Sequence, residues 1–536
     1  MTYSLKALKI VAVCIALFLC LPVLSIFGEL LSVFFQNLWF ENPSQLTSIK
    51  DNLHHFFTYL FIRFIKDTFL VVFGVLFCSL ILGVSCAYLV AQFEFCGSRL
   101  LEKLLVLPLA IPAYILAFIY VGIMDYQSIF YEIFGFRVDF FNIYGAIFVL
   151  SISLFPYVYM FAKTAFKSEA VQLLEVAKTF GYSEFQIFFK VAIKSAKPAI
   201  LSGLMLVFME TLSDYGASAY YGVDTFSAGI FKLWYDLGDP YSAAVLSGFL
   251  MVFVFIVMYI EYLYKVKQKY SFNQNLKVFI QKRTLSKVKS FFAFFYCFCI
   301  ALLGFILPFL WLLYWGLQDA KIFESEFYST LFKTLMLAAI SAVIITIVAY
   351  FLSFVARISK HKFFSVVLLK TSSLGYAIPG AAIGVSVMIV FTLLGDMLDT
   401  ALLGHSLLVL LFAYMIRFVA TALYSLEGGY SKIHTQSDEV SLFIKPSFKT
   451  LFFSIHTPLL KHFLWLSFII VFIDTIKELP LSRMLTPFGF ETLGVKAFWY
   501  ASDERIYDAA LPSLCIVLLS LLAVVWIQSL SKEKEC

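Results

Sequence analysis

Four acidic residues stand in stretches of the chain that are otherwise apolar enough to cross a membrane. Glu210 and Asp214 lie in the segment ETLSD, and Asp474 and Glu478 lie in DTIKE, 264 residues later. The i, i+4 spacing within each segment predicts that both carboxylates share one face of a helix. Carboxylates at membrane depth are costly and indicate a function, and a hard trivalent cation prefers such oxygen ligands. The four residues are therefore candidates for lining a cation pathway.

Structural pairing is the competing interpretation of these carboxylates. Lys477 and Arg417 also lie in predicted spans, and an ion pair with Glu210 or Glu478 would hold helices together without contacting a solute. The residues alone leave both interpretations open.

Two proline motifs stand near the same predicted depth. AIPA ends at Ala113 and contains Pro112, and AIPG ends at Gly380 and contains Pro379. Because proline interrupts the hydrogen bonding of a helix, we expect each motif to break its span and to shape the pathway rather than to bind a solute.

The elements that position these residues are membrane helices. A mean hydropathy of +0.91 and 63 Phe in 536 residues exclude an ordinary soluble domain. Twelve apolar stretches have the length of a spanning helix. They are residues 10–34, 68–91, 104–124, 143–162, 197–213, 242–263, 290–316, 334–356, 364–394, 405–424, 462–480 and 509–530. The first is interpreted as an anchor, with a cleaved signal peptide as the alternative.

The sequence contains an internal repeat and consists of two copies of one unit. AIPA and AIPG, Glu175 and Glu439, and ETLSD and DTIKE recur in the same order at offsets of 264 to 267 residues. The fold class predicted is an all-α integral membrane protein of two parallel six-helix repeats. The predicted domains are residues 1–263 and 290–536, joined by a basic linker over 264–289.

The distribution of Lys and Arg orients these spans. With both termini in the cytoplasm, 27 of these residues fall inside and nine outside, which is a positive-inside pattern. The net charge of +6 therefore reflects topology, and no nucleic-acid partner is expected.

Each half carries an amphipathic segment between its fourth and fifth predicted spans. In the first copy, Gly181 suits a left-handed turn, and Ser183 with Gln186 has the spacing of a capping box. An apolar stripe follows in each copy, at Phe185, Phe188 and Phe189 and at Phe448, Phe452 and Phe453. In the second copy Lys445 replaces the glycine and precedes Pro446, so we expect an extended residue and a different angle between the helices.

These segments resemble the EAA loop of permease subunits of binding-protein-dependent ABC importers. The first, about 169–196, matches at Glu175, Ala177 and Gly181, and the second, about 432–460, matches at Glu439 and Pro458. In that family the loop is a coupling helix that inserts into a groove of the ATPase subunit. The resemblance implies an ATPase-coupling role for Glu175, Gly181, Phe185, Phe188, Phe189, Glu439, Phe448, Phe452, Phe453 and Pro458. An interfacial helix on the bilayer is the alternative.

The resemblance narrows to the ferric-iron branch of that family, in its fused two-domain form. It is carried by LPLAIPAYILAFIYVG (107–122), the stretch 209–244 that begins METLSDYGAS, LGYAIPG (374–380), and IKELP with FGFETL (476–480 and 488–493). It implies the type I ABC importer permease fold and a multi-pass protein of the bacterial inner membrane. It also implies two copies of an ATPase subunit, a periplasmic binding protein and membrane lipid as partners. Related fused permeases handle thiamine or aminophosphonate, which stay open as solutes.

No enzyme motif is present in the sequence. There is no phosphate-binding G-x-x-x-x-G-K-[ST], no H-E-x-x-H and no G-x-S-x-G. The chain is therefore expected to be no enzyme and to carry no cofactor or fixed metal, with ATP bound by the partner subunit. An ion-coupled secondary transporter, which also has parallel repeats, is the alternative of another class.

Overall fold

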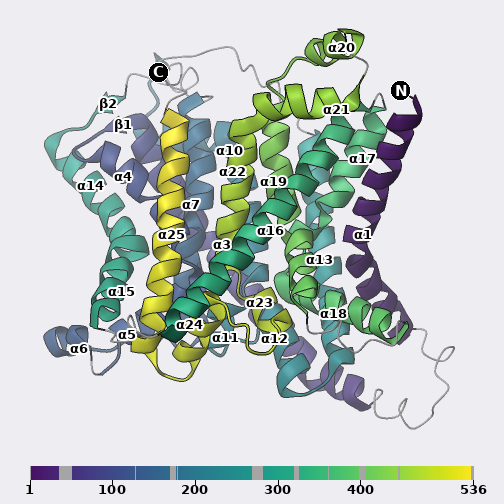
Figure 1. The fold of residues 1–536 in the computed structure, drawn as a ribbon. Helices are drawn as coiled ribbons and strands as arrows, with labels where there is room; N and C mark the ends of the chain where they lie inside the picture. The colour runs from purple at the N-terminus through teal and green to yellow at the C-terminus, as the bar shows by residue number, and fades with distance from the viewer. Residues whose placement is uncertain are drawn as a thin grey trace.

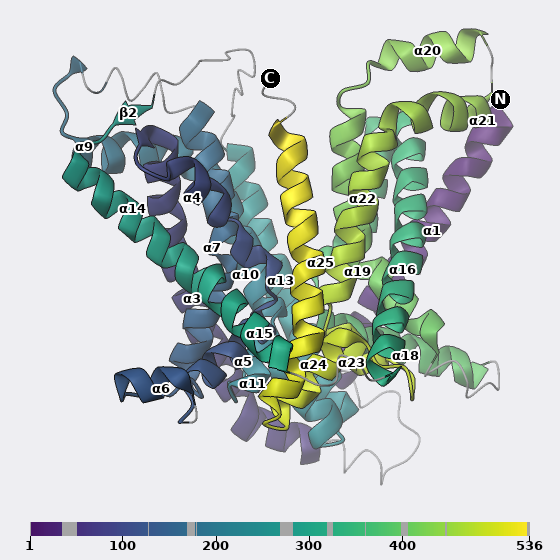
Figure 2. The same cartoon turned by 60° about the vertical axis from the view of Figure 1, so that its left-hand side comes forward.

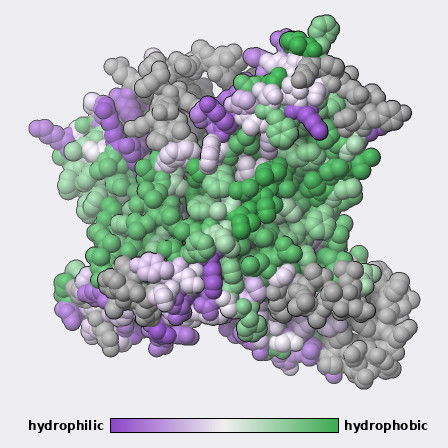
Figure 3. All heavy atoms as spheres, in the orientation of Figure 1, coloured by the Kyte–Doolittle hydropathy of each residue, from purple (hydrophilic) through white to green (hydrophobic). Residues whose placement is uncertain are grey.

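The computed structural model describes residues 2–34, 51–126, 128–168, 177, 179–267, 282–318, 325–359, 361–397, 406–444 and 447–532. These residues are almost entirely helical, as predicted (Figure 1). Their strands are one short parallel pair, β1 (Phe93–Glu94) with β2 (Arg283–Thr284). A belt of apolar side chains separates two more polar ends in Figure 3, which is the surface expected of a protein surrounded by lipid.

The first half of the fold runs from α1 to α13. Its helices are α1 (Thr2–Phe34), η2 (Phe56–Leu60), α3 (Phe61–Gln92), α4 (Ser98–Leu104), η3 (Leu107–Ala110), α5 (Ala113–Ile123), α6 (Ile129–Phe134), α7 (Ile143–Ser168), α9 (Glu184–Gln186), η4 (Ile187–Ala192), α10 (Ile193–Ser213), α11 (Gly216–Tyr220), α12 (Phe226–Phe231), η5 (Lys232–Asp236) and α13 (Pro240–Lys267).

The second half runs from α14 to α25 and presents similar elements in a similar order. Its helices are α14 (Lys287–Ala301), η6 (Leu302–Ile306), α15 (Leu307–Gln318), α16 (Ser325–Ile358), α17 (Lys362–Ser372), η8 (Leu374–Ala377), α18 (Gly380–Met397), α19 (Leu407–Tyr430), α20 (Thr435–Ile444), α21 (Phe448–Thr450), η9 (Leu451–His456), α22 (Thr457–Lys477), α23 (Pro480–Leu485), α24 (Leu493–Ser502) and α25 (Ile506–Lys532). In each half the core is a packed trio of helices, α3, α7 and α10 in the first and α16, α19 and α22 in the second.

The prediction of twelve spans needs a correction at two places. Ten helices of the described residues are long and apolar enough to cross a membrane, and an eleventh span exists if a bent pair is counted as one. That pair, Ser98–Ala110 with Ala113–Ile123, replaces the predicted span 104–124 and bends by 98°. The predicted span 364–394 is likewise interrupted, between α17 and α18. Both interruptions fall at the Ala-Ile-Pro motifs, where breaks were expected.

The first helix of each half packs against the other half. α1 lies against α17 and α18 of the second half as well as α13 of its own. α14, η6 and α15 lie against α4, η3 and α5 of the first half, and α15 also packs on α25. The two halves are therefore interlocked, and neither buries its apolar surface alone.

Both ends of the chain lie at the same end of the molecule. α1 begins and α25 finishes there, beside α20, α21 and the short strands (Figure 2). We call this the terminal end. α6, α11, α23 and α24 lie toward the opposite end.

Candidate functional site

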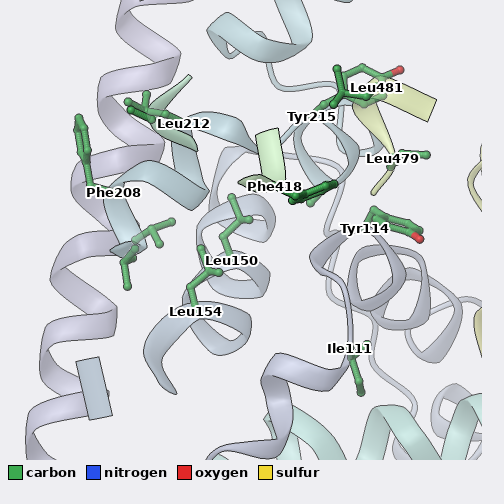
Figure 4. Packing of buried hydrophobic residues seen from close by; sticks show 14 of the residues in the cluster. Ile111, Tyr114, Leu150, Leu154, Phe208, Leu212, Tyr215, Phe418, Leu479 and Leu481 are labelled. Atoms are coloured by element: carbon green, nitrogen blue, oxygen red, sulfur yellow. The ribbon is translucent and has the colours of Figure 1, made fainter. Parts of the chain in front are cut away.

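A cavity of about 240 Å³ lies between the two halves. All six residues predicted for the pathway line it: Pro112, Glu210, Asp214, Pro379, Asp474 and Glu478. Much of the remaining wall is apolar and includes Leu150 and Leu154 of α7 and Phe418 of α19, which are labelled in Figure 4. Residues at equivalent positions of the two repeats therefore lie together around this cavity.

The two proline turns form part of the wall because they end short helices. Ile111, which precedes Pro112, is extended at φ −101° and ψ 115°, as expected of a residue before proline. Ile378 before Pro379 is extended in the same way, at φ −94° and ψ 129°. Each turn separates a 3₁₀ turn from a new helix, α5 or α18, and so exposes non-helical backbone only where protein surrounds a cavity.

Asp214 and Glu478 cap short helices, and the predicted i, i+4 pairing on one helix face is wrong. α10 ends at Ser213 and α22 ends at Lys477, so that each acid is the first residue beyond its helix, with extended backbone. Asp214 accepts hydrogen bonds from the N–H groups of Ala217 (3.4 Å) and Ser218 (2.9 Å) and from the Ser218 hydroxyl (2.9 Å). The carboxylates are held by the next helix because its first N–H groups have no intrahelical acceptor.

Glu478 repeats this arrangement in the second half. It accepts from the N–H groups of Leu481 (3.0 Å) and Ser482 (2.9 Å) and from the Ser482 hydroxyl (3.2 Å). Ser482 is 264 residues beyond Ser218, so the cap is a shared feature of both halves. The primary role of these two acids is therefore to stabilise the turn beside the cavity.

Glu210 and Asp474 differ from the capping acids because they lie inside the last turns of α10 and α22 and line the cavity. Among the described residues, neither carboxylate has a hydrogen bond to protein or a salt bridge within 4.0 Å. They are the two acids of the site whose oxygens are left for a solute.

The cations of the cavity reach across to neutral oxygens of the first half. Arg417 Nη2 donates to Ser213 Oγ at 2.9 Å, and Lys477 Nζ donates to the carbonyl of Leu109 at 2.8 Å. The backbone N–H of Gly380 also approaches Ser213 Oγ, at 3.4 Å. The expected ion pairs of Arg417 or Lys477 with the acids are thus not formed at 4.0 Å among the described residues. The two cations join the halves instead.

Four tyrosines line the cavity, Tyr114, Tyr157, Tyr215 and Tyr376, and the sequence reasoning singled out none of them. Tyr157 of α7 and Tyr376 of η8 both line it. Tyr376 belongs to the quoted motif LGYAIPG, one residue before the Ala-Ile-Pro turn, and this position could have identified it. Tyr157 follows Pro156 inside a long apolar helix, where no pattern distinguishes it from core. Within the described part of the chain, no group of three or more His, Cys, Asp and Glu side chains could hold a metal ion.

The first amphipathic segment begins as predicted. Gly181 has φ +77°, a left-handed conformation, and the capping box forms, with Gln186 N–H donating to Ser183 Oγ and Ser183 N–H donating to Gln186 Oε1. Arg283 Nη1 of β2 contacts both oxygens of Glu184, at 2.8 and 3.0 Å, and ties the segment to the end of the linker. Glu175 lies outside the described residues.

The predicted apolar stripe is divided between two faces. A π-helical turn spans Ile187–Ala192 and shifts the register of the side chains. Phe185 and Phe189 are 72% and 49% exposed, with ring centroids 4.5 Å apart. Phe188 instead packs inward, 4.7 Å from the ring of Tyr88.

The second amphipathic segment has the same division. Phe453 is 67% exposed, whereas Phe452 stacks on Tyr350 at 4.3 Å and contacts Phe354. Phe448 is half-buried, and Glu439 and Pro458 are exposed. Lys445 and Pro446 lie outside the described residues, so the expected difference in angle between the two copies stays a prediction.

A buried polar network fixes α20 in this second segment. Asp438 receives a hydrogen bond from Arg357 Nε at 2.8 Å and contacts His456 Nε2 at 2.9 Å. Tyr430 closes the network through His456 Nδ1 at 3.2 Å. Burial acts to raise the pKa of Asp438, but the hydrogen bonds with His456 and Arg357 outweigh it and hold the pKa below its ordinary value.

The comparison with known proteins agrees with this geometry. Residues 79–265 match the model of the binding-protein-dependent transport system inner membrane component family. This part of the chain is similar to that family. The match covers the first half from α3 to α13 and includes the first amphipathic segment, Glu210 and Asp214. This chain is a multi-pass membrane protein and a component of a transport system.

Individual relatives extend the likeness to both halves. The Fe(3+)-transport system permease protein FbpB 2 of Haemophilus influenzae is 25% identical over 85% of this chain and 87% of its own length. The putative ferric transport system permease protein FbpB 1 of the same organism is 24% identical over 66% of this chain and 56% of its own length. The molybdenum transport system permease protein ModB of Escherichia coli is 28% identical over 26% of this chain and 62% of its own length.

Proposed function

We propose that this chain is the permease of an ATP-driven importer that carries ferric iron from a periplasmic binding protein into the cytoplasm. The cavity between the halves carries the proposal, since Glu210 and Asp474, equivalent residues of the two repeats, present oxygens to one space that no described protein group occupies. Two repeats that each contribute one wall would allow opposite ends of the cavity to open in turn.

The terminal end is the proposed cytoplasmic end. Both termini lie there with the two amphipathic segments, whose exposed phenylalanines suit a groove on an ATPase subunit. One ATPase copy would dock beneath each half, because each half has one such segment. ATP would be bound by that partner, so the permease itself would carry no cofactor. Lipid would surround the apolar belt, and the binding protein would dock at the opposite end.

Iron is the solute proposed because the relative that aligns over most of both chains is named for Fe(3+) transport. The relative named for molybdenum transport aligns over a quarter of this chain. Two free carboxylates also suit a hard cation better than an oxyanion alone.

Uptake of radioactive ferric iron tests this function. Cells that express the chain with its ATPase and binding protein should accumulate iron, and a catalytically inactive ATPase should abolish the uptake. Molybdate, sulfate, thiamine and an aminophosphonate serve as competing solutes. Iron uptake that persists without ATPase activity and collapses with a proton ionophore would establish a secondary transporter instead.

A further inference from the structure

Charged groups of both signs line the cavity, four acids and two cations. Two carboxylates, Glu210 and Asp474, face two cations, Arg417 and Lys477, so that these four groups sum to zero formal charge. The other two acids, Asp214 and Glu478, bring the formal charge of the lining to −2, and each of them accepts three hydrogen bonds from its helix cap.

A bare trivalent cation is poorly matched to such a cavity. Removing a metal ion from water carries a large desolvation cost, which only strong opposite charge and good coordination offset. Here the ion would approach two carboxylates and two cations at once. A complex that presents both signs meets complementary partners of both kinds in the lining.

The lining offers two kinds of polar group without a partner, oxygens for a metal ion and N–H donors for an anion. Glu210 and Asp474 supply carboxylate oxygens, and the hydroxyls of Tyr157 and Tyr376 have no hydrogen-bond partner among the described residues of this cavity wall. Such oxygens are ligands for a hard cation. Among the cations, Arg417 Nη1 is buried without a hydrogen-bond partner in the described structure, and Lys477 uses one of its three donors on Leu109. Guanidinium and ammonium groups favour carboxylate or phosphate oxygens.

We propose that the solute enters this cavity as a ferric ion together with an anion bearing carboxylate or phosphate oxygens. The carboxylates and phenols contact the metal, and Arg417 and Lys477 contact the anion. The inference rests on the proposed function, because iron is taken as the solute, and it adds that the permease recognises the complex rather than the metal alone.

Double-label equilibrium dialysis of the full chain in lipid nanodiscs tests the inference. Radioactive iron is supplied with labelled citrate, with labelled phosphate, or as a neutral hydroxamate complex, and each anion is also tested alone. The wild type should retain iron and one of the anions in a constant ratio and should retain the neutral complex poorly. Arg417→Gln with Lys477→Gln should weaken retention of the anionic complex tenfold or more, since a hydrogen bond to a charged group is that strong.

Matched variants separate recognition from folding. Arg417→Lys keeps the charge and should restore much of the retention. Lys333→Gln removes a lysine that also donates to a backbone carbonyl, that of Gly489 at 2.9 Å, but lies outside the cavity wall, and it should change nothing. Glu210→Gln with Asp474→Asn should abolish retention of the iron label.

Three results would overturn the inference: equal retention of the neutral complex, full retention by the double cation variant, or no retention of either label by the wild type. Ferric uptake in cells is measured separately. Normal uptake beside a failed dialysis experiment rejects only the paired solute, whereas absent uptake rejects the proposed function as well.

Discussion

At the scale of single residues, the acids of the cavity fall into two classes that their shared spacing conceals. Asp214 and Glu478 hold the N-termini of α11 and α23, while Glu210 and Asp474 have no described protein partner. A carboxylate that caps a helix contributes to stability, and one that faces a cavity contributes to what the cavity binds. The two classes therefore respond differently to neutral replacement.

The capping acids should matter for folding more than the cavity acids. We expect Asp214→Ala and Glu478→Ala each to destabilise the protein by about 1–2 kcal/mol, the usual loss when a side chain that bonds the N–H groups of a helix start is removed. Glu210→Gln and Asp474→Asn keep the side-chain volume and should leave stability nearly unchanged. Thermal unfolding of the purified variants in one detergent compares the four. A loss from Glu210→Gln as large as that from Asp214→Ala would contradict this division.

The contacts of Asp438 predict a response of α20 to acid. Because the folded-state pKa of Asp438 lies below its usual value near 3.9, the ionised carboxylate stabilises α20 fully above that value. This contribution is lost as the pH falls through the lower folded-state pKa. Hydrogen–deuterium exchange over residues 435–444, corrected for intrinsic rates, should therefore rise steeply below about pH 4.

Asp438→Asn provides the control for that response. This variant should exchange faster at neutral pH, since Arg357 and His456 lose their charged partner, and should lose the additional rise in acid. Exchange that is unaffected by the substitution at every pH would show that the network does not fix α20.

At the scale of elements, one continuous helix in each half connects an amphipathic segment to the cavity. Residues Glu184–Ser213 form the first, and residues Phe448–Lys477 form the second, each of 30 residues. At 1.5 Å per residue each extends about 45 Å. Each contains a π-helical turn near the terminal end, η4 or η9, at the junction with α10 or α22. A displacement of either segment by a docked partner would thus be transmitted along one helix to Glu210 or Asp474.

The exposed phenylalanines should carry the docking of the ATPase. We expect Phe185→Asp with Phe189→Asp and Phe453→Asp to reduce co-purification of the ATPase strongly, because a buried aromatic anchor contributes about 2 kcal/mol or more. The amount of inserted permease should stay the same, since these rings contact little of their own chain.

Phe188→Asp and Phe452→Asp form the contrasting pair. Their rings pack on Tyr88 and Tyr350, so a charge there should lower the yield of folded permease first. Undiminished ATPase co-purification by the exposed-ring variant would reject the docking role of these segments.

The interlocking of the halves predicts a specific cross-link. Cys86 of α3 and Cys297 of α14 are both fully buried and lie next to each other. In a variant that keeps only these two cysteines, a membrane-permeant oxidant should form a disulfide with loss of two protons and two electrons. A protease site inserted in the linker then lets a non-reducing gel show the two halves still joined.

Cys78 with Cys297 is the matched pair for this experiment. Cys78 lies eight residues earlier on α3, about 12 Å along the helix, and should cross-link poorly. Equal cross-linking of both pairs, or none of Cys86 with Cys297, would contradict the packing of α14 against α3.

At the scale of the whole molecule, the repeat and the crossing of the first helices act together. The cavity lies between halves, and its cations Arg417 and Lys477 are held by Ser213 and Leu109 of the other half. Because α1 and α14 each pack on the opposite half, the halves stay associated while those polar contacts break and re-form. This arrangement allows a change at the cavity without separation of the two units.

Periodicity, hydropathy and internal repetition determined much of this protein by themselves. They identified a helical membrane protein, the breaks at Pro112 and Pro379, the left-handed Gly181 and six of the residues that line the cavity, because these depend on local backbone chemistry or on long apolar runs. Only the tertiary structure decided that α10 and α22 end before Asp214 and Glu478, that Phe188 turns inward, and that Arg417 and Lys477 bond across the halves. Those outcomes depend on which group of a distant segment lies within about 3 Å, and sequence spacing along one helix carries no information about that distance.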